Sequence, residues 1–134
     1  MTGYEKDIAG VVESLHADLA AWLGSAAPPE IFERFAEAQH ERFSMVAMCG
    51  SVLGRDELLT GLREARNTEP GLRIEVSELT ELAREGDLVV VRFLERHLSD
   101  DGPSSRRVSA VLCAVEDSSS GYRWLSVHET AVDE

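Results

Sequence analysis

The chain of 134 residues has little lysine, few aromatic residues and no long apolar run. Lys6 is the single lysine among 13 basic residues, which face 25 acidic ones and leave a net charge of −12. Nucleic acids and anionic membranes attract clusters of Lys and Arg, so this charge argues against either as a partner. The scarcity of lysine is typical of a GC-rich genome, and we therefore expect a bacterial source.

Signals for membrane insertion, secretion and disulfide bonding are also missing. No apolar stretch approaches the roughly 18–20 residues of a membrane-spanning helix. The first residues show no basic start followed by an apolar run, so no secretory signal is predicted. Cys49 and Cys113 each lie in an apolar, strand-like run without a Cys-x-x-Cys spacing. We expect buried free thiols, with a disulfide or a reactive thiol as the alternatives, and a cytoplasmic location.

Motifs of cofactor, metal and nucleophile sites are absent as well. The sequence contains no Gly-rich phosphate loop, no Gly-x-Ser-x-Gly and no His-Glu-x-x-His. We therefore predict no cofactor and no metal site, and a nucleophilic triad has no support. What is present is an ordinary globular composition, 43% hydrophobic and 28% charged, in a chain that fits one domain over 1–134.

Helical periodicity is confined to the first half of the chain. Apolar residues at spacings of three and four predict a helix over 8–23. A second helix, opened by a proline, is predicted over 29–40, and a third over 58–65 before a Pro-Gly breaker. His16 is expected to be an exposed residue of the first helix.

Strand patterns dominate the second half. A short apolar strand is predicted over 43–49, and four more follow over 72–79, 88–98, 106–116 and 122–130, with turn formers between them. Helices followed by antiparallel strands predict an α+β domain. We expect a curved sheet that wraps around the helices and encloses a cavity between them.

One face of the predicted sheet carries polar groups among apolar ones. Aligning the hairpins by their turns places Ser109 between Glu95 and Glu129. The same alignment sets His97 opposite Arg107. Further along the strands it brings together three apolar side chains, Phe93, Val111 and Val127. A slip of one residue would turn these groups to the other face.

These polar groups have two interpretations. In a partly dry cleft, Glu95 and Glu129 can differ in pKa and act as acid and base, with Arg107 holding an anionic or carbonyl oxygen. The alternative is an ion-pair network of the same three residues at the rim of the sheet. His40 is either a proton carrier in the cavity or a cap of the second helix. The ligand would also contact His97 and Ser109, the apolar residues of this face, and side chains that equally suit the core, Trp22, Phe35 and Met45.

The opposite face of the predicted sheet is too apolar to be left in contact with water. On the register above it carries, among others, Arg92, Leu112, Trp124 and His128. We therefore predict that this face forms the interface of a homodimer, with His128 hydrogen-bonded there.

Four segments carry a resemblance to a known superfamily: 21–23 at the end of the first helix, 43–46 with the glycine that follows, 54–58 before the third helix, and 124–130 in the last strand. Over essentially its whole length the chain resembles the nuclear-transport-factor-2-like superfamily, in the branch of SnoaL-like and ketosteroid-isomerase-like small proteins. The resemblance implies a cone-shaped α+β fold, a cavity between the concave sheet and the helices, and a homodimer built on the outer sheet face.

The resemblance does not select an activity, because this fold serves isomerases, dehydratases, cyclases and non-catalytic association domains. The known isomerases use an Asp base with a Tyr and a protonated acid. Tyr4 and Tyr122 lie near element starts, and no Asp lies mid-strand on the inward face, so ketosteroid-isomerase chemistry is not expected. Two hypotheses stand. One is a small-molecule pocket protein, which is either a proton-transfer isomerase, dehydratase or cyclase or a non-enzymatic ligand binder. The other is a non-catalytic homodimerisation or association module.

Overall fold

The computed structural model describes residues 7–133. Within them the chain forms three helices and six strands, in the order α1 Ile8–Gly24, α2 Pro29–Glu37, β1 Gln39–Val46, β2 Val52–Gly54, α3 Arg55–Glu64, β3 Arg73–Glu85, β4 Leu88–Ser99, β5 Gly102–Ala114 and β6 Tyr122–Val132. The strands join into one sheet of order β2-β1-β6-β5-β4-β3. The predicted α+β fold with a curved sheet is confirmed.

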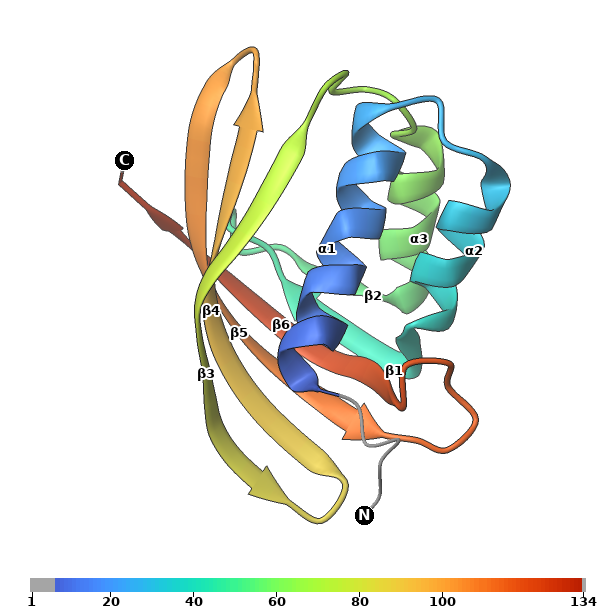
Figure 1. Cartoon of the computed structure of the whole chain (residues 1–134), viewed down its shortest axis with the longest axis vertical. Helices are drawn as coiled ribbons and strands as arrows, with labels where there is room; N and C mark the ends of the chain where they lie inside the picture. The colour runs from blue at the N-terminus through green and yellow to red at the C-terminus, as the bar shows by residue number, and fades with distance from the viewer. Residues whose placement is uncertain (1–6, 134) are drawn as a thin grey trace.

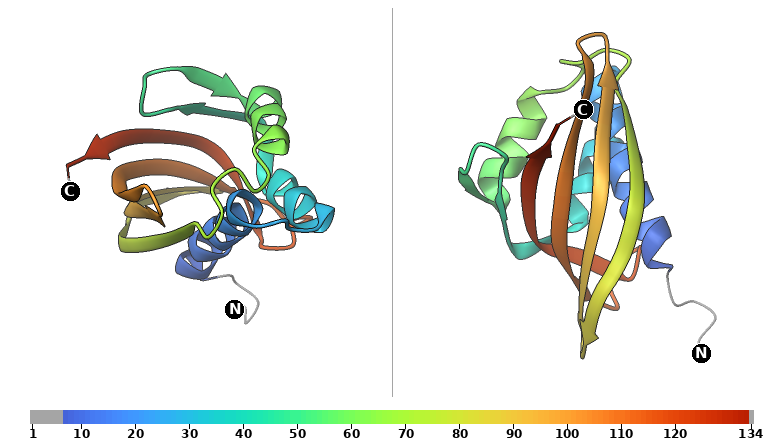
Figure 2. Two further views of the ribbon diagram at one scale, coloured as in Figure 1. Left: turned by 90° about the horizontal axis from the view of Figure 1, so that it is seen from above. Right: turned by 90° about the vertical axis from the view of Figure 1, so that its left-hand side faces the viewer.

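The sheet curves around the helices, which all lie on its concave side (Figures 1 and 2). Strands β3 to β6 form the predicted antiparallel meander. The parallel pairing of β6 with β1 was not predicted. It brings the first strand beside the last, so that the sheet continues under α2 and α3. Among residues 7–133, no helix is long and apolar enough to cross a membrane.

The main core lies between α1 and the concave face of the sheet. Its most deeply buried side chains, 2% exposed or less, are Val12, Val89, Val91, Phe93, Val108, Ala110, Leu112 and Trp124. A smaller cluster joins the three helices and contains Trp22, Ala27, Phe32, Phe35 and Leu59. The space between the two clusters is where a cavity can form, because the helices and the sheet diverge there.

The register of β4 with β5 differs by three residues from the predicted one. Glu95 pairs with Arg106 rather than with Ser109. The cause is the hairpin turn: Ser99 pairs with Gly102, so β5 begins four residues earlier than predicted. Gly102 has φ +96°, which favours glycine in a tight turn. Because the slip is an odd number of residues, it exchanges the two faces of β5.

This exchange moves several predicted residues to the opposite face of the sheet. Arg107, Ser109 and Val111 alternate with the buried residues of β5 and lie on the outer face. Leu112 and Trp124, predicted for the dimer interface, are instead in the core, 0% and 2% exposed. A bulge between Val111 and Leu112 aligns these two side chains across β5 and β6. From the predicted interface, Arg92 and His128 remain exposed outside the core.

Two further predictions about local structure were wrong. Helix α2 ends at Glu37, so His40 lies in β1, where its Nδ1 accepts a hydrogen bond from the amide of Arg42 at 3.0 Å. Cys49 is exposed, because β1 ends at Val46 and the chain then turns. Cys113 is partly buried, and both thiols are free.

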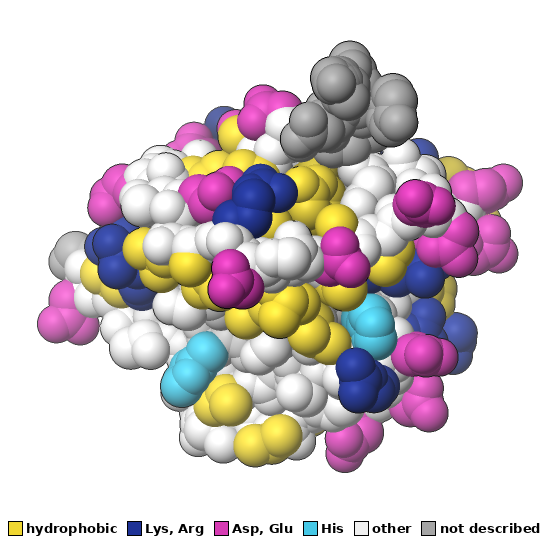
Figure 3. All heavy atoms as spheres, turned by 90° about the horizontal axis from the view of Figure 1, so that it is seen from below, with side chains coloured by type: hydrophobic (Ala, Val, Ile, Leu, Met, Phe, Trp, Pro, Cys, Tyr) yellow, Lys and Arg dark blue, Asp and Glu magenta, His cyan; other side chains and the backbone are white. Residues whose placement is uncertain are grey.

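Acidic side chains are spread around the end of the molecule that is opposite to the β4–β5 hairpin (Figure 3). They lie among hydrophobic and a smaller number of basic side chains there. The excess of acidic residues in the sequence is thus not gathered on one docking patch at this end.

We expect Gly24→Ala to destabilise the fold by about 1–3 kcal/mol. A Cβ at position 24 would lie 2.9 Å from the backbone nitrogen of Leu72, and a backbone atom cannot move aside cheaply. Gly10→Ala, on the same helix with nothing within 4 Å of the added Cβ, is the control and should be neutral or stabilising. Urea unfolding of both variants checks this, and equal effects would contradict the close-approach argument.

Candidate functional site

A partly open cavity of about 420 Å³ lies between the concave face of the sheet and the helices. The turn of the β4–β5 hairpin and the loop after α3 also contribute lining residues, and both lie at the same end of the molecule (Figure 1). Most of the lining is apolar: Leu15, Leu19, Leu23, Phe35, Phe43, Met45, Leu58, Leu62, Phe93, Val108, Trp124 and Val127. Four polar side chains with ionisable groups share the deeper wall, namely His16, Glu95, His97 and Arg106.

The centre of this wall is the carboxylate of Glu95, which is 3% exposed. Its Oε1 lies 3.1 Å from Nε2 of His16 on α1, and its Oε2 lies 2.5 Å from Nε2 of His97 on the same strand. His16 is itself buried, with the rings of Phe93 and Trp124 packed edge-on at centroid distances of 5.3 and 5.9 Å. One carboxylate therefore holds two histidines.

The partners of His16 determine its protonation. Nδ1 lies 2.8 Å from the carbonyl oxygen of Val12, which can only accept, so Nδ1 carries a proton. Nε2 faces the carboxylate of Glu95 and donates as well. Burial alone would lower the pKa of His16, but the hydrogen bond and charge of Glu95 outweigh it and raise the pKa. His16 is therefore an imidazolium paired with a carboxylate.

Glu95 is held ionised by the same contacts. Burial alone would raise its pKa, but the hydrogen bonds from His16 and His97 hold the pKa well below the ordinary value. An ionised carboxylate only accepts, so Nε2 of His97 donates to it. In neutral His97 the free lone pair is then on Nδ1. Among the residues that the structure describes, none bonds to that nitrogen, and His97 lines the cavity.

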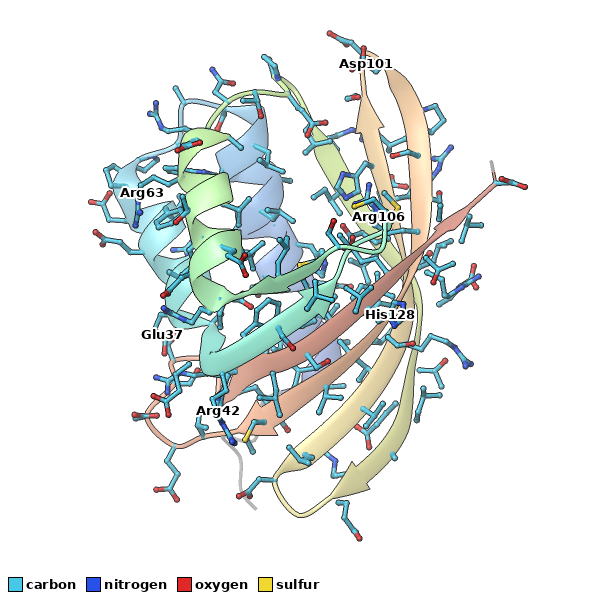
Figure 4. All side chains as sticks on the ribbon, turned by 180° about the vertical axis from the view of Figure 1, so that it is seen from behind. Glu37, Arg42, Arg63, Asp101, Arg106 and His128 are labelled. Carbon is cyan, nitrogen blue, oxygen red and sulfur yellow. The ribbon has the colours of Figure 1, made fainter. Side chains whose placement is uncertain are left out.

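Arg106 and Glu129 form a second polar pair beside the first. Arg106 is the register partner of Glu95 and lies on the helix side of β5 (Figure 4). Its Nη1 is 3.7 Å from Oε1 of Glu129, which is too long for a hydrogen bond. Burial and the nearby charge of Glu95 raise the pKa of Glu129. The electrostatic effects of Arg106, His97 and His16 lower this pKa, but by less.

The structure brings some of the predicted site residues together and separates others. Six line the cavity: Phe35, Met45, Phe93, Glu95, His97 and Val127. Glu129 lies behind them against Arg106. Five do not line it: Trp22, which donates to the carbonyl of Leu62; His40 in β1; Arg107, paired with Glu78 at 3.0 Å; Ser109; and Val111.

Two members of the polar wall, His16 and Arg106, were not predicted. His16 had a signal in the sequence, since it lies four residues after Val12 and three before Leu19, on the apolar stripe of the predicted helix. Arg106 had no such signal in the sequence. The adjacent Arg107 carries the same group toward the opposite face, so only the register of β5 decides which of the two arginines faces the helices.

No protein-family model matches the chain, and no curated protein matches it. Several solved structures do. An NTF-2-like protein of unknown function from Pseudomonas aeruginosa is 26% identical with a TM-score of 0.87, over 94% of this chain and 98% of that one. An NTF2-like protein from Rhodospirillum rubrum, described as of unknown function in nutrient uptake, is 20% identical with a TM-score of 0.68, over 95% and 99%. A candidate dehydratase of the NTF2-like family from Streptomyces avermitilis is 16% identical with a TM-score of 0.75, over 95% of both chains.

The chain is thus a small protein with the NTF2-like fold, as its sequence pattern predicted. The neighbours share the arrangement of helices and sheet. They do not assign an activity to the cavity.

The buried pair of His16 and Glu95 gives a pH dependence of stability. The pKa of Glu95 is depressed, so its contribution is lost as the pH falls below the ordinary carboxylate value of about 4.3. The pKa of His16 is raised, so its contribution is complete below about 6.5 and is lost as the pH rises through the raised value. The pair of His16 and Glu95 therefore stabilises the folded state most between these two pH values.

We expect His16→Asn to lose about 3–5 kcal/mol of stability near pH 6, because it leaves the buried carboxylate of Glu95 short of a donor. The stability of the wild type should decline as the pH rises through the raised pKa of His16, and this part of the decline should be absent in the variant. His40→Asn, outside the cavity, is the control and should keep the wild-type profile. Urea unfolding at pH 5 to 9 measures both. An unchanged alkaline slope in the His16 variant would contradict the assignment of an imidazolium.

Proposed function

We propose that the chain binds a small, largely apolar molecule in this cavity and moves a proton on it, with His97 as the general base and acid. The observation that carries the proposal is the pairing of His97 Nε2 with a buried, ionised Glu95 while Nδ1 has no partner among the described residues. A histidine fixed in one tautomer by a carboxylate is a standard arrangement for proton transfer. Isomerisation and dehydration next to a carbonyl group both need such a base.

The roles of the two carboxylates follow from their contacts. Both oxygens of Glu95 are engaged by histidines, which favours an orienting role over direct attack on a substrate proton. His16 supplies the charge that keeps Glu95 ionised in a buried place. Glu129, with its raised pKa, is suited to donate a proton, although it does not itself line the cavity and contacts Arg106, which does.

The apolar lining supports a ligand with a substantial hydrocarbon part. The volume of about 420 Å³ lies toward the small end of the range of roughly 300–1,000 Å³ that is usual for ligand pockets. Phe93, Val108 and Val127 line the cavity together with the polar wall and make its surroundings largely apolar. In such a place a base and its charged partner act with little screening.

We expect the wild-type protein to catalyse exchange of the α-protons of 2-indanone with deuterium oxide, and His97→Gln to reduce the rate by roughly 10²–10⁴. The probe is an apolar ketone of suitable size, and ¹H NMR follows the loss of signal. His128→Gln, an exposed histidine outside the core, is the control and should leave the rate unchanged.

Two outcomes would count against this role. Equal rates in the wild type and the His97 variant would remove the histidine from the reaction. Absence of exchange above the buffer rate in the wild type would contradict a base that acts on carbonyl compounds, and a non-catalytic association module would be the better description.

We further propose that the outer sheet face contacts a second copy of the chain. Its apolar side chains Val90, Leu94, Val111 and Leu125 lie among the exposed Arg92 and Ser109 and have no helix over them (Figure 2). Both signs of charge are present, since Glu78 also lies there beside Arg107. A face of mixed charge can meet its own copy with opposite charges opposed.

We expect light scattering after size exclusion to give a dimer for the wild type and a monomer for Leu94→Glu, which places a charge in the middle of the face. Val52→Glu, a change on the exposed edge strand β2, is the control and should remain dimeric. A monomeric wild type would exclude this interface.

A further inference from the structure

Arg106 has a donor that nothing in the described part of the chain satisfies. Its Nε is fully buried, and no hydrogen-bond acceptor among residues 7–133 reaches it. Arg106 is also the one Arg or Lys among the described residues that line the cavity. Buried donors in native proteins are almost always bonded, so the described chain supplies this guanidinium with too few acceptors. The rest of the Arg106 side chain is 16% exposed and lines the cavity, so its other N–H groups can donate to a ligand there.

The neighbouring carboxylates do not neutralise this guanidinium well. Glu95 lies across from it in the sheet but gives both oxygens to His16 and His97. Glu129 is the nearest partner, and the separation of 3.7 Å leaves no hydrogen bond between them. A guanidinium presents several N–H groups in a planar fork, which suits the two oxygens of one carboxylate.

We propose that Arg106 binds the carboxylate of the ligand, and that the cavity takes apolar monocarboxylic acids, whose hydrocarbon part packs against Phe93, Val108 and Val127. This inference rests on the proposed function, because it assumes that the cavity holds a ligand. A single carboxylate is favoured over a phosphate or a dicarboxylate. One arginine supplies one positive charge, and Glu69 and Asp101, which also line the cavity, repel a second negative charge.

Binding to Arg106 also sets the distance between the carboxylate of the ligand and His97, the proposed base. Glu95 and Arg106 are register partners, and His97 lies two residues further along β4 on the same face. Two residues of a strand span roughly 7 Å, so the carbons that follow a carboxylate bound to Arg106 lie within reach of the imidazole. The proton that His97 would move is then on a carbon close to the carboxylate.

Glu129 modulates the same subsite. When its carboxyl group is protonated, Arg106 keeps its charge for the ligand, and when it ionises it competes for the guanidinium. The raised pKa of Glu129 moves this competition to a higher pH than for an ordinary carboxyl group, and at a pH where Glu129 is ionised the competition weakens ligand binding. The other ionisable groups facing this pair are Glu95, His97 and His16, of which Glu95 and His16 compensate each other. Glu129→Gln should therefore bind a carboxylate more tightly than the wild type does.

The test compares 3-phenylpropionate with 3-phenylpropan-1-ol by isothermal titration calorimetry. The two probes share one hydrocarbon part and differ in the charged group. We expect the acid to bind the wild type roughly tenfold or more tightly than the alcohol, the range for a hydrogen bond to a charged group. Arg106→Met should remove this preference and leave the alcohol affinity within about twofold. Arg106→Gln is a second variant for the case in which the first does not fold.

Arg107→Met is the matched control, because it removes the same charge from the adjacent residue on the outer face. It should keep the preference for the acid. Equal affinity for both probes, or equal losses in the Arg106 and Arg107 variants, would overturn the carboxylate site while leaving a ligand-binding cavity. If neither probe binds the wild type, this inference falls, whereas the proposed function falls only if the wild type also fails to catalyse the exchange of 2-indanone. If His97→Gln still binds 3-phenylpropionate but no longer catalyses proton exchange, the carboxylate is held by Arg106 and the proton is moved by His97.

Discussion

The buried carboxylate of Glu95 constrains the rest of this structure. A carboxylate is removed from water only where donors and positive charge replace its hydration. Here His97 comes from the same strand, but His16 comes from α1, so the helix must lie at one position along the sheet. The edge-on rings of Phe93 and Trp124 then fill the space around His16. The placement of α1, the protonation of His16, the orientation of the His97 ring and the polar wall of the cavity all depend on this one group.

The tight β4–β5 hairpin is the second constraint, because it decides which arginine reaches Glu95. With Ser99 paired to Gly102, Arg106 faces the cavity and Arg107 faces outward to Glu78. A longer turn would exchange the two faces of β5 and bring Arg107 inward, as the sequence analysis predicted. Two adjacent arginines offer the same chemistry to both faces, so the turn alone selects between them.

The sequence predicted the elements well and the site only in part, and the difference has a physical basis. Periodicity reports which residues of one element share a face, so the helices, the four long strands and the inward position of Glu95 and His97 could be read directly. Register between strands depends on turn geometry, and the early start of β5 at Gly102 was read as loop. His16 was missed for another reason: its position on the apolar stripe of α1 indicated burial, but the partner that makes burial of a histidine favourable, Glu95, lies 79 residues away in the sequence.

The contacts of the polar wall also separate a ligand site from a self-satisfied ion-pair network. A network that serves only stability would be expected to satisfy its buried donors, since each one left unbonded costs about 1–3 kcal/mol. His16 and Glu95 meet that expectation, with every polar atom engaged. Arg106 does not: its Nε is buried without an acceptor in the described chain, and its contact with Glu129 is long. Arg106 also lines the cavity, as does His97, whose Nδ1 has no partner among the described residues. The wall thus combines one group of side chains whose hydrogen bonds are complete and which fixes the geometry, and a second group that lines the cavity with hydrogen-bonding capacity left over. That division is expected of a site whose remaining hydrogen bonds are made by a ligand.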